Sequence, residues 1–433
     1  MSPGSRTAAW SLLLATLFAC LQLTSVSGRA TPDTKNYLSY ALTLQGDTPR
    51  TAATRTITYV CAQSPPPPTG HHTCTAKLTR AISRHGGPRT TSPITPFAGP
   101  RFLRIFEVRP GYPLLLAPFI AAAGVTWGVW AAALFVTVTG GLLVVRVLRT
   151  LGARPAVAVA GQGLYYALPS GATAMRPMTE GTLMVLTLAV VWGYLLVLRK
   201  EKPRRGFALA AAAFAALFAV KHTQALFLGV TLAAALAAVA AVRRRGGRRA
   251  GPEVTGLLAL AAGAAGATAL VAHALHYPSA YDSVQDLLTH HYARPDVPHP
   301  WRELAYTEAR FWTGWLRHQC LQPLLPVLLA GAGWAAYRRS PVFAAVLAAA
   351  ACSGVVNQAA HPDSTLWGDR LIVMVWLLPA IGLPLLAEWA GAHRVTSVTG
   401  AARHGTDEEC TLPPPPPRGA PARTSSSAAS SGR

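Results

Sequence analysis

Long apolar runs separated by short polar turns cover most of the chain after residue 110. Such runs predict membrane-spanning helices, because a helix needs about 20 apolar residues to cross the bilayer core. The runs lie at 8–27, 126–145, 155–169, 181–198, 206–220, 225–242, 254–275, 320–337, 341–358 and 371–387. The pattern therefore predicts an all-α integral membrane protein with about ten transmembrane helices and a large first loop.

Two polar regions are too long to be simple turns, and loops of this length are usually functional or disordered. After the first of them, Pro113 and Pro118 predict a short interfacial helix before the next span. The predicted segments are a first transmembrane helix at 1–27, a loop at 28–110, transmembrane helices at 111–275, a second loop at 276–319, C-terminal transmembrane helices at 320–389 and a disordered tail at 390–433.

The first apolar run has two interpretations. Arg6 precedes it and the small residues 26–28 follow it, as in a cleaved signal peptide. The run is also long enough to span a bilayer, and many further spans follow. We therefore expect an uncleaved first helix.

The distribution of basic residues predicts how the chain is oriented in the membrane. Apolar residues make up 51% of the 433 residues and charged residues only 13%, which fits a membrane protein. The basic clusters at 146–154, 199–205, 243–249 and 338–339 fall on one alternating side, which the positive-inside rule makes cytoplasmic. We expect a multi-pass protein of the plasma membrane with both termini cytoplasmic and both long loops extracytoplasmic.

The net charge of +22 does not indicate nucleic acid as a partner. The basic residues lie mainly between apolar runs and in the two long polar regions, and they form no basic helix or patch interleaved with aromatic residues. Topology and contact with lipid headgroups account for them. Membrane lipids are therefore the expected partners of this charge.

The cysteines leave two questions open. Cys61 and Cys74 share the first loop and could form a disulfide if that loop faces an oxidising compartment. His71, His72 and Cys74 are metal-ligating residue types, but no second spaced pair accompanies them, so a solvated loop is expected instead.

Asp33 is the candidate for chemistry in the first loop, since it lies shortly after the first predicted helix. A carboxylate at the headgroup plane, partly desolvated, can serve as a general base. A helix cap or a solvated acid is the alternative. The residues after it form an amphipathic helical stripe, composed of Tyr37, Tyr40, Ala41, Leu42 and Leu44.

Three segments resemble the GT-C class of membrane glycosyltransferases, in particular bacterial mannosyl- and aminoarabinose-type transferases. Asp33 followed by Tyr37 resembles the acid of their first outer loop. The segment Phe106-Glu107-x-Arg109-Pro110-x-Tyr112-Pro113-Leu114-Leu115 resembles the segment that closes that loop. The turn 174–180, with Arg176 and Glu180, resembles their second outer loop.

The resemblance implies an inverting transferase that moves a sugar from a polyprenyl-phosphate donor to an extracytoplasmic glycan, lipid or protein. In it, Asp33 would be the catalytic base. The substrate-binding candidates are Tyr37, Glu107, Arg109, Arg176, Glu180, Lys221, His222 and Arg370. No cofactor and no metal ligand is assigned, and a divalent metal is left open, since the first loop lacks an adjacent acidic pair.

Several candidates have a plainer explanation. Arg109, Arg176 and Arg370 could neutralise a departing phosphate or could anchor the protein at lipid headgroups. Lys221 and His222 interrupt apolar sequence, either as functional groups at membrane depth or as the outer end of a helical hairpin.

In the second loop, Asp282, Asp286 and His290 share one face of a predicted helix, with His291 next to them. This face could line an acceptor or metal site, or it could be the solvated side of an amphipathic helix on the membrane. Two further functions stay open for the whole chain: a multi-pass transporter and a non-catalytic membrane protein.

Overall fold

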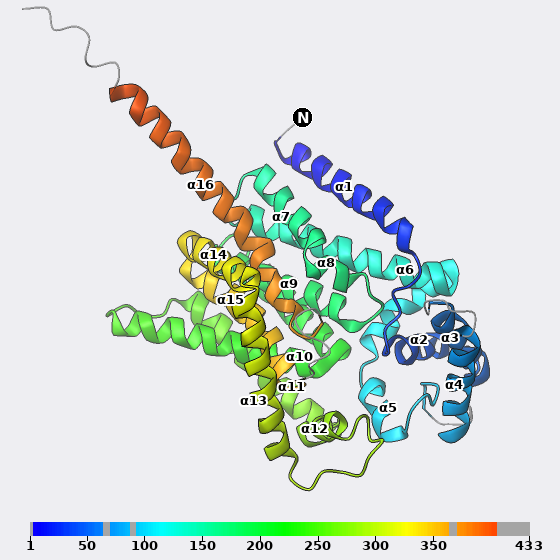
Figure 1. Cartoon of the computed structure of the whole chain (residues 1–433). Coiled ribbons are helices and arrows are strands. Elements are labelled where there is room, and N and C mark those ends of the chain that lie inside the picture. Colours follow the sequence, from blue (N-terminus) through cyan, green and yellow to red (C-terminus); the bar gives the residue numbers. More distant parts are fainter. Residues whose placement is uncertain (1–2, 64–69, 87–91, 363–369, 405–433) are drawn as a thin grey trace, which may run out of the picture. The chain divides into compact units, whose positions relative to one another are not determined.

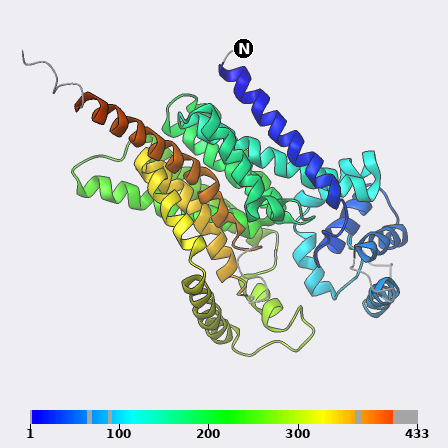
Figure 2. The ribbon, with the colours of Figure 1, turned by 45° about the horizontal axis from the view of Figure 1, so that its top comes forward.

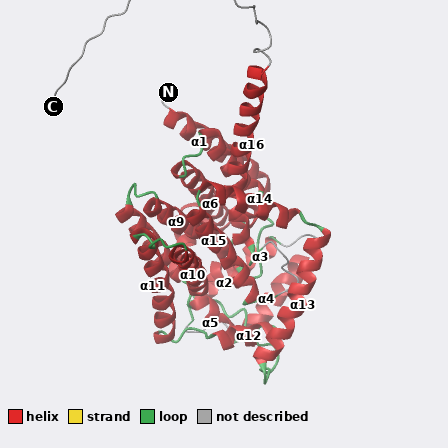
Figure 3. Ribbon diagram, turned by 90° about the vertical axis from the view of Figure 1, so that its left-hand side faces the viewer, coloured by secondary structure: helices red, strands yellow, loops and turns green. Residues whose placement is uncertain are grey.

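The computed structural model describes residues 3–63, 70–86, 92–362 and 370–404. Every regular element in these residues is a helix (Figure 3). Two compact units divide the chain, residues 1–389 and 390–433. All that follows concerns the first unit.

The long apolar helices form the body of this unit (Figure 1). They are α1 (Pro3–Gln22), α6 (Gly111–Thr150), α7 (Pro155–Ala167), α9 (Thr179–Leu198), α10 (Pro203–Arg245), α11 (Pro252–Ala274), α14 (Leu324–Arg339), α15 (Pro341–Ala359) and the first part of α16 (Leu377–His404). Shorter elements of the body are η1 (Leu23–Ser25), α8 (Pro169–Ala174) and η3 (Val373–Trp376).

Within the described ranges, seven helices are long and apolar enough to cross a membrane. An eighth span results if α13 (Pro300–Leu321) and α14, which meet at a bend of 83°, are counted as one broken span. The class of multi-pass, all-α membrane protein is thus supported, whereas the count of about ten is not confirmed. One reason is that α7 has 13 residues, which gives it a length of about 20 Å.

Two of these helices contain a break that reverses the chain. In α6, Gly124 has φ 72°, a backbone conformation that glycine adopts readily, and Gly128 then packs against Phe119 and Ile120. In α10, the helical dihedrals are interrupted at Lys221. Both halves of α10 lie along α11, as the hairpin predicted around residues 221–224 requires.

Glycines allow close packing between the long helices. A Cβ atom on Gly193 of α9 would lie 2.7 Å from the carbonyl oxygen of Gly206 in α10, so only glycine fits there. Small residues at helix contacts are typical of membrane proteins, where van der Waals packing replaces the hydrophobic driving force between helices.

Polar contacts join several of the short turns. Arg154 pairs with Glu388, Lys200 pairs with Glu253, and Arg339 donates hydrogen bonds to the carbonyl oxygen of Leu151. These contacts involve three of the four predicted basic clusters. They link the chain between α6 and α7 with α14 and α16, and the turn after α9 with the start of α11.

The described residues of the first long loop fold into four helices beside α6 (Figures 1 and 2). They are α2 (Thr34–Leu44), α3 (Pro49–Ala62), α4 (Gly70–Arg84) and α5 (Pro100–Glu107). The helix expected after Asp33 is confirmed as α2. Tyr37, Ala41 and Leu42 of the predicted stripe are buried, whereas Leu44 is exposed. The predicted polyproline element at 65–68 lies outside the described residues.

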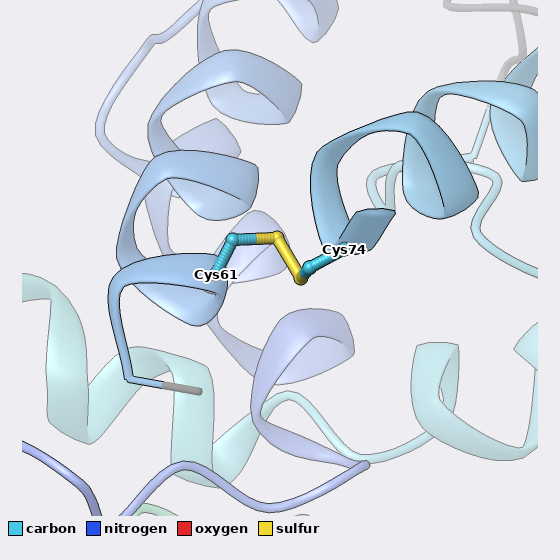
Figure 4. The surroundings of a disulfide bond; sticks show 2 residues. All are labelled: Cys61 and Cys74. Carbon is cyan, nitrogen blue, oxygen red and sulfur yellow. A yellow bond between two sulfur atoms is a disulfide. The ribbon is translucent and has the colours of Figure 1, made fainter. Parts of the chain in front are cut away.

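A disulfide between Cys61 and Cys74 joins α3 to α4, with 5.6 Å between their Cα atoms (Figure 4). This answers the question that the sequence left open. It also removes Cys74 from the candidate metal ligands, because its sulfur is bonded to another cysteine.

The second long loop contains α12 (Ala280–Leu288) and then α13. Arg101 of α5 pairs with Asp296 at 2.7 Å and with Asp282 at 3.1 Å. Arg104 donates a hydrogen bond to the carbonyl oxygen of His276. The two loops are therefore joined through α5.

Candidate functional site

Asp33 directly precedes α2 and makes no capping hydrogen bond with its side chain. The capping explanation for this acid is therefore wrong. Its carboxylate instead accepts a hydrogen bond from the guanidinium of Arg370, which comes just before η3. The Asp33 side chain is 22% exposed, so it is reachable from outside.

Glu180 is the second acid that Arg370 holds. It lies in the first turn of α9, its side chain is only 4% exposed, and its Oε1 is 3.1 Å from Arg370 Nε. Burial alone would lower the pKa of Arg370, but the charges of Glu180 and Asp33 outweigh it and raise that pKa. Arg370 is thus a permanent cation between two carboxylates.

Lys221 lies next to this cluster, at the break in α10. Its ammonium donates a hydrogen bond to Asn357 Oδ1 at 3.3 Å, and it is buried. The charges of Glu180, Arg109 and Arg370 all act on it. The break in α10 places this buried ammonium beside the two acids.

His222 is buried beside Lys221, and its Nδ1 has no hydrogen-bond partner within the described residues. Its ring contacts those of Tyr277 and Phe218, with centroids 5.1 and 6.3 Å away. The structure thus places His222 at the edge of the charged cluster, on an aromatic wall.

Tyr37 and Arg109 also lie within electrostatic reach of the cluster. The ring of Tyr37 meets those of Phe106 and Tyr112 edge to face, at 5.2 and 5.3 Å. Burial raises the pKa of Tyr37, against the opposing charge and hydrogen bond of Arg109. Arg109 Nε has no hydrogen-bond partner in the described part of the chain.

A cavity of about 550 Å³ opens beside Arg370. Three arginines line it: Arg29, Arg176 and Arg370. Its apolar wall includes Phe18 of α1 and Tyr166 of α7, whose rings stack at 4.3 Å. A cavity with cationic and apolar walls suits an anionic headgroup attached to a hydrocarbon chain.

Arg29 is a cavity residue that the sequence analysis did not single out. Its guanidinium bonds Gln22 at 2.5 Å and the carbonyl oxygen of Ser25 at 2.8 Å. The one feature of the sequence that could have pointed to Arg29 is that it is the first charged residue after an apolar run. The same signal marks any interfacial anchor, so it does not identify a site.

Glu107 is engaged elsewhere. It accepts a hydrogen bond from the hydroxyl of Ser92, within the first loop. Arg109, two residues further on, interacts with Tyr37 instead, so the closing segment of the loop divides between two environments. The expectation that Glu107 binds substrate stays a prediction.

The second loop differs from its predicted arrangement. Helix α12 ends at Leu288, so His290 does not share a helical face with Asp282 and Asp286. Asp282 forms a capping box with Ser279 instead. Asp286 pairs with His291 at 3.1 Å. The sequence pattern missed this pair because the chain leaves the helix one residue before His290.

The described residues contain no group of three or more histidine, cysteine or acidic side chains that could hold a metal ion.

Comparisons with protein families, with curated proteins and with solved structures found no match.

Proposed function

We propose that this chain is a membrane glycosyltransferase that moves a sugar from a polyprenyl-phosphate donor to an acceptor hydroxyl outside the plasma membrane. The observation that carries the proposal is the cluster of Asp33, Arg370 and Glu180 beside the arginine-lined cavity. The resemblance of the segments around Asp33, Arg109 and Arg176 to the GT-C class supports it. The cluster joins a carboxylate whose side chain is 22% exposed to a cation suited to phosphate.

The donor fits the cavity by charge and polarity. Guanidinium groups bind phosphate oxygens in a bidentate manner, and Arg29, Arg176 and Arg370 provide three of them. The stacked rings of Phe18 and Tyr166 provide an apolar wall for the hydrocarbon chain. The phosphate would then lie against Arg370, within reach of the acid that Arg370 holds.

The reaction needs one proton acceptor and one stabilised leaving group. The acceptor oxygen attacks the anomeric carbon, and the bond from that carbon to the phosphate oxygen breaks. The polyprenyl phosphate leaves with the electron pair and is stabilised by the arginines. The proton of the acceptor hydroxyl passes to Asp33.

Donor binding would also release Asp33 from Arg370, so that its carboxylate can act as the base. Arg370 is shared between Asp33 and Glu180 in this structure. A phosphate that binds Arg370 competes for its donors and weakens its bond to Asp33. Glu180, which is nearly fully buried, keeps the guanidinium in place meanwhile. The base is therefore released only when the donor is present.

The disulfide supports an extracytoplasmic position for the first loop. Disulfides form and persist in oxidising compartments and are rare in the bacterial or eukaryotic cytosol. The loop with Cys61 and Cys74 also contains Asp33. We therefore propose that the active face is extracytoplasmic and that both termini are cytoplasmic, in agreement with the basic turns.

A transporter is the second candidate function, and one observation favours it. Lys221 is a buried cation at a break in α10, and transporters often place ionisable groups at broken helices. A non-catalytic membrane protein is the remaining alternative. Neither alternative explains why a partly exposed carboxylate pairs with an arginine that lines the cavity.

The test is the transfer of radiolabelled sugar from polyprenyl-phosphate donors in membranes that contain the full chain. Asp33→Asn should abolish transfer, because the amide cannot take the proton. Asp47→Asn is the matched control, since Asp47 is in the same loop and pairs with Arg55 at 2.6 Å, away from the cluster. Equal transfer by Asp33→Asn and wild type would exclude Asp33 as the base. No transfer by the wild type would favour the transporter or the non-catalytic protein.

A further inference from the structure

The turn after α12 has an unusual backbone. His290, His291 and Tyr292 have φ values of 53°, 64° and 56°, so three successive residues other than glycine lie in the left-handed region. Side chains disfavour this region, and such residues persist only where the surrounding structure holds them. They also tend to cluster at functional sites, so this turn requires an explanation.

Several contacts hold the turn in place. The hydroxyl of Tyr292 donates a hydrogen bond to the carbonyl oxygen of Asp282 at 2.6 Å, and the Arg101 guanidinium lies 4.2 Å from the centre of the Tyr292 ring. The backbone N–H of His291 donates to the carbonyl oxygen of Asp286 at 2.9 Å. Contacts from both long loops therefore hold this turn in its left-handed conformation.

The turn brings a buried acid against an exposed imidazole. Asp286 Oδ1 lies 3.1 Å from His291 Nδ1, and the side chains are 10% and 60% exposed. With Nδ1 facing the carboxylate, Nε2 is the ring nitrogen left to act outside the pair. A carboxylate that orients an imidazole in this way is a common arrangement in acid–base catalysis.

The imidazole is connected to the Asp33 site by a row of rings. Tyr37, one turn into α2, meets Phe106, which meets Phe102, which meets His291, with centroid separations of 5.2, 5.3 and 4.5 Å. The hydrogen bond to Asp286 raises the pKa of His291, against the effect of burial. The charge of Asp33 raises it further and that of Lys35 lowers it, so both lie within electrostatic reach.

We infer that His291, oriented by Asp286, is a second acid–base residue of the Asp33 site and receives the acceptor proton from Asp33. This inference rests on the proposed transfer reaction. Asp33 must lose the acceptor proton before the next cycle, because only the carboxylate form can act as a base. An imidazole is the side chain best suited to accept it near neutral pH.

The protons balance over one cycle. The acceptor O–H bond breaks as its oxygen bonds the anomeric carbon, and Asp33 takes the proton. Asp33 passes it through water to Nε2 of His291, and Asp286 stabilises the imidazolium. The imidazolium then releases the proton to solvent, to which its ring is open.

The test uses three variants of the full chain in the transfer assay described above. His291→Asn removes the base but keeps the turn, because asparagine tolerates left-handed backbone. His290→Asn is the matched control, since it has the same backbone conformation one residue earlier. Asp286→Asn tests the positioning residue.

We expect His291→Asn to lower turnover by about 100-fold or more, with the KM for the donor unchanged and with partial rescue by added imidazole. His290→Asn should match the wild type. Asp286→Asn should move the acid limb of the pH profile to lower pH, because its carboxylate raises the pKa of His291.

Full turnover in His291→Asn, with Asp33→Asn inactive, would overturn this inference alone. Loss of turnover that imidazole does not rescue, together with a lower thermal midpoint, would show a purely structural role and would overturn it too. Absence of transfer in the wild type would overturn the proposed function and the inference together.

Discussion

The guanidinium of Arg370 bonds the carboxylate of Asp33, although 337 positions separate the two residues in the chain. One residue precedes the last helices of the bundle and the other follows the first helix. The contact therefore links the two ends of the helical body at the point where the first loop begins. Glu180, at the start of α9, completes it.

Removal of Arg370 should destabilise the protein. Arg370→Ala leaves Glu180 buried without this partner and frees Asp33, so we expect a loss of about 2–3 kcal/mol in the free energy of unfolding, below the range for a fully buried pair. Thermal unfolding in detergent would measure it. Arg154→Ala is the control, because Arg154 is 64% exposed in its pair with Glu388 and should contribute at most about 1 kcal/mol. Equal losses in the two variants would contradict the central role of Arg370.

The disulfide should stabilise the first loop. Cys61 and Cys74 are 13 positions apart, and a bridge over such a segment contributes about 3 kcal/mol by restricting the unfolded chain. The double replacement by alanine should lower the thermal midpoint and increase hydrogen exchange in α3 and α4. Cys352→Ala serves as the control, since Cys352 is a free cysteine of α15. Unchanged exchange in the double variant would indicate that packing alone holds α4.

The Asp286–His291 pair should make the second loop more stable at low pH. Its hydrogen bond raises the pKa of His291 in the folded state above the ordinary 6.5. A raised pKa adds stability that is fully present below the unfolded value and is lost as pH rises through the folded value. Asp286→Asn should therefore increase hydrogen exchange around residues 286–292 at about pH 5 but much less at about pH 9. An equal increase at both values would contradict the protonated pair.

Replacement of Gly193 by a larger residue should destabilise the contact between α9 and α10. A Cβ atom there would lie 2.7 Å from the Gly206 carbonyl oxygen, so Gly193→Ala must push α9 and α10 apart, at a cost of about 1–3 kcal/mol. The control is Gly263→Ala in α11, where a Cβ atom meets nothing within 4 Å. That change should be neutral or stabilising, because alanine favours helix. A thermal shift assay compares the two variants. An unchanged thermal midpoint in Gly193→Ala would show that the contact between α9 and α10 has room for a Cβ atom.

Some of the site was predictable because its signals are local. Asp33 follows an apolar run and precedes an amphipathic stripe, and both features are visible in the sequence. Lys221 interrupts apolar residues, so its special environment could be predicted as well. Arg370 was a candidate only as one of several outer arginines, since nothing near it in the chain indicates which acids it binds.

Other features had no local signal. His291 pairs with Asp286 because the chain turns into left-handed backbone after α12, and helical periodicity cannot predict such a turn. The same limit explains why His290 was placed on the wrong face. Arg101 joins the two loops through Asp282 and Asp296, residues that only the folded chain brings to it.

The class of the protein, its apolar helices and the chain reversal at Lys221 follow from the order of residues alone. Hydrophobic length and helix-breaking positions are properties of neighbouring residues, so they can be read in order along the chain. The tertiary structure decided which charges meet. Buried and half-buried charges need partners, and the partners of Asp33, Glu180 and Arg370 lie in three distant segments. Only the packing of the helices brings them together, which is why the site emerges from the fold.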